Sequence, residues 1–203
     1  MPASTHLGSQ LVDLCSVLLL LCCFAIVAQR RLSACVDLFA LQSAFLAATA
    51  ALVAFLTGHK HIYFAAALTI VIKVIVLPRI LRKVIERLNV SRELGMNINI
   101  PAGLLICGAL VIIAFFITQP IIPIGFFTMI ARQKAITQMV GFLVMENGVF
   151  LGATAAAYGM PLIVELGVFF DVLVAGLIVG IYTHRLQDTF DSVDTSTLTV
   201  LKE

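Results

Sequence analysis

The sequence predicts an all-α protein, a polytopic bundle of six to seven transmembrane helices. Hydrophobic residues make up 61% of the 203 residues and charged residues only 12%, and the mean hydropathy is +1.10, whereas soluble domains are roughly 45–50% apolar. Apolar runs of about 20 residues, the length that crosses a bilayer, recur along the chain. The polar stretches are too short to hold a core of their own, so we expect a single membrane domain over residues 1–203.

Six apolar runs account for the confident helices, in order along the chain. The predicted spans are 11–28, 35–57, 62–79, 101–118, 137–157 and 161–183. The stretch before Leu11 has no Lys or Arg, and the first run continues to Ala28, so we expect a retained first helix and not a cleaved signal peptide. In the third run, Pro78 predicts either a loosened helix near Lys73 or a plain helix end before Arg79.

A shorter apolar run, residues 121–131, lies between Pro120 and Arg132. As a helix it covers only about 17 Å of a hydrocarbon core roughly 30 Å thick, so its length predicts a partial or re-entrant segment. The basic residues favour a seventh crossing, with residues 132–136 extending this helix, because Lys and Arg concentrate on the cytoplasmic side. With seven crossings all of these basic residues lie on the cytoplasmic side, and with six they do not. They are Arg30, Arg31, Arg79, Arg82, Lys83, Arg87, Arg92, Arg132, Lys134 and Arg185. Seven spans place the N-terminus outside and the C-terminus in the cytoplasm.

Two acidic residues lie in the middle of long apolar segments. Glu146 is 13 residues before Gly159 and Asp171 is 12 residues after it, so helical rise places both roughly 18–20 Å from the turn at 158–161. A carboxylate at the centre of a membrane helix is costly and usually marks an ion or proton pathway. The alternative for each is a buried acid that is hydrogen-bonded for packing. We predict that Glu146 and Asp171 share a proton-path site.

Lys73 is expected at the same depth. It follows His61 by twelve residues, so it lies about 18 Å from the predicted outer loop. Lys73 could carry a proton, tune a neighbouring carboxylate, or form a purely structural pair. Two further acids are weaker members of the proton path: Glu165, which is about 120° around the helix from Asp171, and Asp37, which lies near the membrane interface.

The other polar residues and the cysteines within the apolar runs are expected to serve in packing between helices. Gln42 and Ser43 lie deep in the second run and are expected to form interhelical hydrogen bonds. The five cysteines are expected to be reduced packing residues, because they show neither a CxxC pair nor a His at zinc-ligand spacing. We therefore expect no metal, no iron–sulfur cluster and no other cofactor in this chain, and no catalytic centre, since nucleotide-binding and nucleophile motifs are absent. The net charge of +2 forms no face for nucleic acid.

Three segments resemble the hydrogenase-4 component E family, the membrane subunits of group 4 nickel–iron hydrogenases and formate hydrogenlyases. They are residues 142–148 (FLVMENG), residues 164–171 (VELGVFFD), and Lys73 followed by Pro78. The resemblance covers nearly the whole chain. The C-terminal half of the chain is also similar to the K-type subunit of respiratory complex I, with Glu146 and Asp171 as the matching acids. The alignment places that subunit's helix-two acid opposite Leu143, one turn from Glu146, and the run 121–131 is shorter than the family's helix.

The resemblance implies a multi-pass subunit of a prokaryotic plasma (inner) membrane complex. It divides the chain into a four-helix part (1–118), a K-subunit-like part (119–185) and a cytoplasmic tail (186–203). It also implies antiporter-like and other membrane subunits as partners, with the nickel–iron centre and iron–sulfur clusters in other subunits of an oxidoreductase complex.

The sequence is compatible with three functions. In the first, the buried Glu146, Asp171 and Lys73 contribute to proton or ion translocation, which is coupled to electron transfer elsewhere in the complex. In the second, the chain is a structural scaffold that joins antiporter-like subunits without conducting protons itself. A third, an independent ion transporter, normally shows discontinuous helices or an inverted repeat, and the sequence has no repeat.

Overall fold

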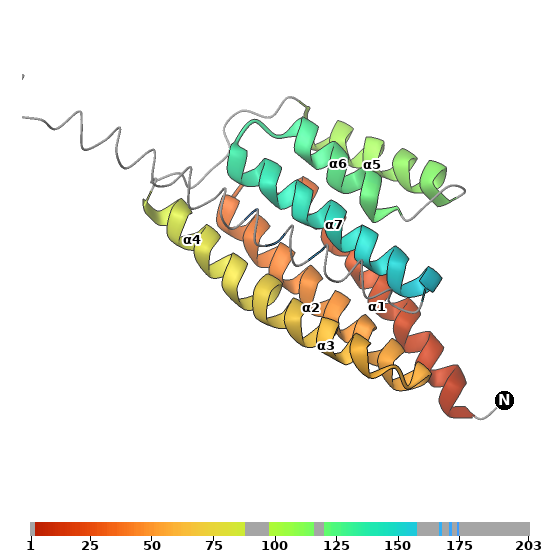
Figure 1. The fold of residues 1–203 in the computed structure, drawn as a ribbon. Helices are drawn as coiled ribbons and strands as arrows, with labels where there is room; N and C mark the ends of the chain where they lie inside the picture. The colour runs from red at the N-terminus through yellow and green to blue at the C-terminus, as the bar shows by residue number, and fades with distance from the viewer. Residues whose placement is uncertain are drawn as a thin grey trace, which may run out of the picture.

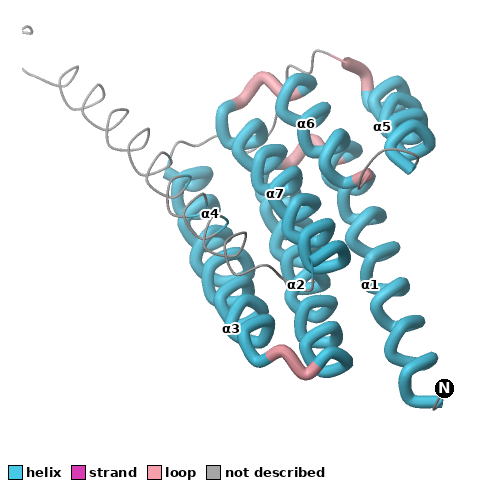
Figure 2. The backbone as a smooth tube through the Cα atoms, turned by 45° about the vertical axis from the view of Figure 1, so that its right-hand side comes forward, coloured by secondary structure: helices cyan, strands magenta, loops and turns pink. Residues whose placement is uncertain are grey.

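The computed structural model describes residues 3–87, 98–115 and 120–157, together with the helical residues 167, 171 and 174. Helices joined by short connections make up these parts of the chain (Figure 2). The elements are α1 (Ala3–Ala28), α2 (Leu32–Thr57), α3 (Lys60–Thr69), η1 (Ile70–Val76), α4 (Leu77–Arg87), α5 (Ile100–Phe115), α6 (Ile121–Ala131) and α7 (Ala135–Ala157). Because α3, η1 and α4 follow one another without a break, they form one rod, which we call the α3–α4 rod. The all-α class is confirmed.

Four of the described helices are long and apolar enough to cross a membrane. These are residues Gln10–Ala28, Leu32–Thr57, Ile62–Glu86 and Ala135–Thr154, while Ile100–Ala114 and Ile121–Ala131 are shorter. Large apolar side chains such as Phe55, Phe64 and Leu105 are 69–76% exposed, as expected for a surface that faces lipid. The predicted span 161–183, apart from residues 167, 171 and 174, and the tail 186–203 lie outside the described residues.

Helix α2 lies at the centre of the bundle (Figure 1). It packs against α1, against the whole α3–α4 rod and against α7, while α6 covers another face of α7. The polar residues Gln42, Ser43 and Thr49 lie on α2 and are buried with its apolar residues. The turn from α2 into α3 is made by Gly58, whose φ of 73° is a left-handed conformation that glycine adopts without strain.

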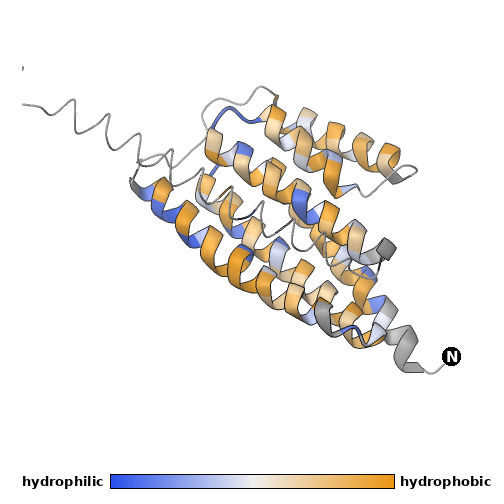
Figure 3. Ribbon diagram, viewed as in Figure 1, coloured by the Kyte–Doolittle hydropathy of each residue, from blue (hydrophilic) through white to orange (hydrophobic). Residues whose placement is uncertain are grey.

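The arginines of the described helices and connections gather at one end of the bundle, and the colouring by hydropathy makes this visible on α4 and on the α6–α7 connection (Figure 3). Arg30 and Arg31 connect α1 to α2, Arg82 pairs with Asp37 near the start of α2, and Arg132 contacts the last turn of α1. We call this end the basic end, and the opposite end, at the turn from α2 to α3, the Gly58 end. Because α6 runs back towards the basic end, the direction predicted for residues 121–131 is the one observed; seven membrane crossings stay a prediction.

Arg132 fixes the end of α6 against α1. Its side chain is buried, and Nη2 lies 2.9 Å from the carbonyl oxygen of Ile26, 3.0 Å from that of Val27 and 2.7 Å from that of Gln29. The last carbonyls of a helix have no intrahelical donor, and a cation near them also offsets the helix dipole. The backbone at Arg132 is extended, with φ −95° and ψ 142°, so the predicted continuation of α6 through 132–136 is wrong: the arginine leaves the helix to reach α1.

Replacing Arg132 with methionine is expected to lower the free energy of unfolding by about 1.5–3 kcal/mol, the range for hydrogen bonds to a charged group. Denaturant titration of the purified protein in detergent measures the change. Arg82→Met is the matched control, because the Arg82–Asp37 pair is more than half exposed and such pairs contribute about 0–1 kcal/mol. Equal losses in the two variants would contradict a capping role for Arg132.

Glycines allow α6 and α7 to approach each other closely. A Cβ added at Gly125 would lie 2.5 Å from the backbone nitrogen of Met145, one at Gly141 would lie 2.8 Å from that of Met129, and one at Gly148 would lie 2.9 Å from that of Ile122. Along these three contacts the residue numbers increase on α6 and decrease on α7, so the two helices are antiparallel. Close backbone approach through small residues is the usual way in which membrane helices associate.

Candidate functional site

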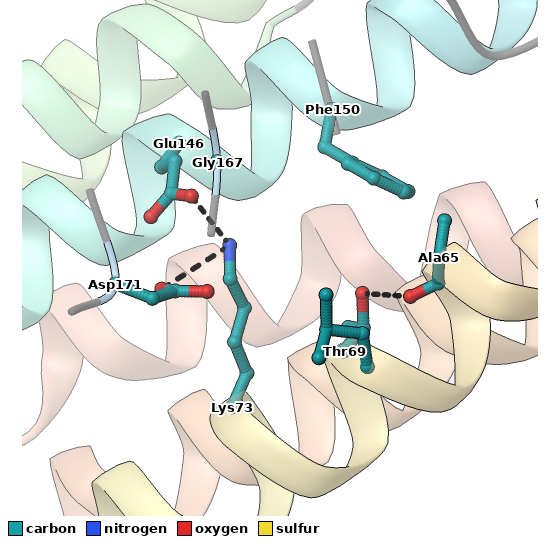
Figure 4. Close-up of a pocket in the computed structure, with 8 residues that line it drawn as sticks. Ala65, Thr69, Lys73, Glu146, Phe150, Gly167 and Asp171 are labelled. Atoms are coloured by element: carbon teal, nitrogen blue, oxygen red, sulfur yellow. Dashed lines mark hydrogen bonds and ion pairs between the residues drawn. The ribbon is translucent and has the colours of Figure 1, made fainter. Parts of the chain in front are cut away.

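Lys73 lies between the two acids that the sequence places at mid-membrane depth. Its ammonium nitrogen Nζ is 3.0 Å from Oε1 of Glu146 and 3.7 Å from Oδ1 of Asp171, and the side chains of all three residues are at least nine-tenths buried (Figure 4). Counting helical rise from the predicted loops thus placed the three residues in one layer, and the structure brings them into contact. We call Lys73, Glu146 and Asp171 the triad.

The helix that carries Lys73 is widened around it. Residues Ile70–Val76 form π-helical turns, and the N–H of Leu77 donates to the carbonyl of Ile72, five residues earlier. Pro78 explains the position of this segment, because a proline ring in regular α-helix clashes with the carbonyl four residues before it, here that of Val74. The helix then continues to Arg87, so Pro78 loosens the helix and does not end it. Wide turns of this kind often occur at functional sites.

The two acids reach Lys73 from different parts of the chain. Glu146 lies on α7, two residues before the glycine that lets α6 approach. A Cβ added at Gly167 would lie 3.2 Å from Oε1 of Glu146, so the missing side chain at Gly167 leaves room for the carboxyl group. Asp171 is helical, buried, and one turn along from Gly167.

A buried amide connects the triad to α2. Lys73 Nζ donates to Oδ1 of Asn147 at 3.1 Å, and Nδ2 of Asn147 donates to Oε1 of Gln42 at 3.4 Å and to Oγ of Ser43 at 3.2 Å. Gln42 in turn donates to Sγ of Cys23 on α1 at 2.9 Å. The prediction of interhelical hydrogen bonds at Gln42 and Ser43 is confirmed. Sequence reasoning missed Asn147 as a site residue, although a carboxamide within an apolar span is itself a signal for a polar interhelical contact.

The acids keep unused hydrogen-bonding capacity. No described group donates a hydrogen bond with suitable geometry to either carboxylate oxygen of Glu146 or to Oδ1 of Asp171. The Lys73 ammonium donates a hydrogen bond to Asn147 and lies within ion-pair distance of one oxygen of Glu146 and one of Asp171. One ammonium facing two ionised carboxylates leaves a net negative charge in an environment where an uncompensated charge is costly.

The remaining predicted residues lie elsewhere. Asp37 pairs with Arg82 at 2.6 Å in an exposed contact, and it does not join the triad. Glu165 lies outside the described residues. The five cysteines form no disulfide; Cys15 is partly buried and the other four are buried.

Comparison with known proteins gives matches along nearly the whole chain. It is 32% identical to the uncharacterized protein Rv0085 of Mycobacterium tuberculosis, over 96% of this chain and 97% of that protein. It is 22% identical to hydrogenase-4 component E of Escherichia coli, over 96% of this chain and 99% of that protein, and equally to the protein of that name in Shigella flexneri. No protein-family model matches the chain, and no solved structure matches it.

Proposed function

The chain belongs to the same family as the mycobacterial protein Rv0085, and from this premise and the buried triad we propose that it is a proton-translocating, non-redox membrane subunit of a complex-I-like hydrogenase or related oxidoreductase. The distant full-length similarity to hydrogenase-4 component E supports the class of complex. In this proposal antiporter-like subunits flank the chain in a prokaryotic plasma membrane. Other subunits carry the nickel–iron centre and the iron–sulfur clusters.

The observation that carries the proposal is the charge of the triad. Glu146 and Asp171 share one ammonium at 3.0 and 3.7 Å, so the buried cluster reaches neutrality when it binds one more proton. A proton held on one of two nearby carboxyl groups can pass between them, and the pair titrates as a unit. Arrival of charge in a neighbouring subunit shifts that equilibrium electrostatically, which couples the triad to electron transfer elsewhere.

We expect Glu146→Gln and Asp171→Asn each to reduce proton translocation by the assembled complex by about tenfold or more, since a positioned proton-transfer group typically contributes 10²–10⁴-fold. The amides keep the shape of the acids but cannot carry a proton. The measurement is the number of protons moved per turnover in sealed membrane vesicles. Asp37→Asn is the matched control, because it makes the same change in an acid that lies outside the triad. Full translocation by the double variant would exclude the proposal.

The second candidate function is a scaffold that joins larger subunits, and the polar network from Lys73 through Asn147 to Gln42 favours it. Buried polar contacts can fix how helices pair without any role in conduction. A scaffold predicts that Glu146→Gln and Asp171→Asn translocate protons normally, whereas Glu146→Ala and Asp171→Ala reduce the amount of assembled complex. The same set of variants therefore separates the two functions.

A further inference from the structure

A small cavity adjoins the triad on one side. Its wall contains the triad together with Ala65, Thr69, Phe150 and Gly167 (Figure 4). Its volume is about 10 Å³, close to the room that one water molecule requires. Both acids whose oxygens lack a hydrogen-bond donor among the described residues therefore line the cavity.

The cavity extends towards the Gly58 end. Thr69 and Ala65 lie four and eight residues before Lys73, about 6 and 12 Å along the rod, in the direction of the turn at Gly58. Phe150 lies one turn beyond Glu146 on α7, which runs towards the same end. Apart from the triad itself, the described residues that line the cavity lie between the triad and the Gly58 end.

The cavity is lined by acceptors that no hydrogen bond among the described residues satisfies. Lys73 donates to Asn147 and forms ion pairs with both acids, and the hydroxyl of Thr69 donates to the carbonyl of Ala65 at 2.9 Å. Both carboxylate oxygens of Glu146 and Oδ1 of Asp171 can accept, and so can the lone pairs of the Thr69 hydroxyl. A water molecule supplies two protons and fits a site with several acceptors.

Resting on the proposed function, we infer that this cavity binds one water molecule and is the port through which the triad exchanges protons with the Gly58 side of the membrane. A triad carboxyl group gives its proton to the water, and the water passes one of its own protons outward past Thr69 and Phe150. The reverse sequence reloads the carboxylate. Thr69 is a positioning residue in this scheme, since its oxygen holds the water beside Glu146.

Thiol labelling at Thr69 tests the port in the whole complex. Thr69→Cys replaces the hydroxyl with a thiol of similar size, in a chain whose five native cysteines are changed to alanine. Thr154→Cys is the matched control: Thr154 is equally buried, lies in the same half of the bundle and donates to the carbonyl four residues earlier, but it does not line the cavity. The probe is 2-aminoethyl methanethiosulfonate, added to one face of sealed vesicles with free cysteine on the other face to remove reagent that leaks through.

We expect Thr69→Cys to react at least about tenfold faster than Thr154→Cys, because the reactive thiolate forms only where water reaches the sulfur. The faster reaction should come from the Gly58 face. Equal rates for the two variants, or faster reaction of Thr69→Cys from the basic face, would overturn the inference. Labelling needs no turnover, so a negative labelling result leaves the translocation test of Glu146→Gln unaffected. If Thr69→Cys reacts as expected but the amide variants translocate protons fully, only the proposed function is rejected.

Radiolytic hydroxyl-radical footprinting of the unmodified complex provides a second measurement that depends on no substitution. Phe150 lines the cavity, whereas Phe39 is fully buried in α2 away from it. We expect oxidation of Phe150 several times above that of Phe39, because radicals form from water next to the ring. Equally low oxidation of both rings would contradict a bound water at this site.

Discussion

Replacing Lys73 with methionine is expected to abolish proton translocation and to cost the protein about 3–5 kcal/mol, the usual penalty for removing one partner of a buried ion pair. Methionine has similar length but no charge, so Glu146 and Asp171 lose the ammonium that lies 3.0 and 3.7 Å away. The amide oxygen of Asn147 loses its donor in the same change. Denaturant titration in detergent measures the stability, and vesicle assays measure translocation.

A double variant separates charge balance from conduction. Lys73→Met with Glu146→Gln restores the net charge of the original cluster, because one cation and one anion are removed together. We expect it to recover part of the lost stability, because Glu146 no longer leaves an unpaired carboxylate in the bundle. It should still fail to move protons. A single Lys73→Met variant with normal stability and translocation would contradict the role given to Lys73.

Replacing Gly125 with leucine is expected to break the contact between α6 and α7 and to cost more than about 3 kcal/mol, the upper end of the usual range for an overpacked core. A Cβ at this position already lies 2.5 Å from the backbone nitrogen and 2.7 Å from the Cα of Met145. Backbone atoms cannot rotate away as the end of a side chain can, so the helices must separate. The amount of folded protein in the membrane and its resistance to denaturant report the effect.

Gly108→Leu on α5 is the control for this change, because no atom lies within 4 Å of a Cβ built there. It makes the same substitution in an apolar helix and is expected to leave stability unchanged or slightly raised, since glycine is a poor helix former. If the two leucine variants lost stability equally, the close approach of α6 and α7 would not be the cause.

The sequence predicted the helical bundle well because membrane spans leave a simple signal: a long apolar run with charges at its ends. The same signal located the triad, since depth follows from counting residues from a loop, and Lys73 and Glu146 lie in one layer for that reason. Counting gives depth but not orientation around the helix axis. The contacts of Asn147 with Lys73, Gln42 and Ser43 therefore depended on coordinates.

Two other features needed the structure for a different reason. Arg132 looked like a marker of membrane sidedness, whereas its guanidinium caps the end of α1, a contact between segments more than a hundred residues apart. Pro78 predicted either a loosened helix or a helix end near Lys73, and the π-helical turns at Ile70–Val76 with the continuation to Arg87 show that it is the first. A local sequence pattern does not contain the long-range contact of Arg132, and it left the two alternatives at Pro78 open.

The short length of α6 has a consequence for the surrounding lipid. Helix α6 begins at Ile121, whose Cβ lies beside Gly148, so it starts level with the triad, while residues 149–157 of α7 continue about 14 Å further. Just beyond that level, Val149 is 44% exposed. Helix α2 is thus long enough to match the full hydrophobic thickness of a bilayer, whereas α6 by itself is not. A bilayer adapts to a short hydrophobic stretch by thinning, at fractions of a kcal/mol per Å, so we expect lipid beside α6 to be thinner than lipid beside α2.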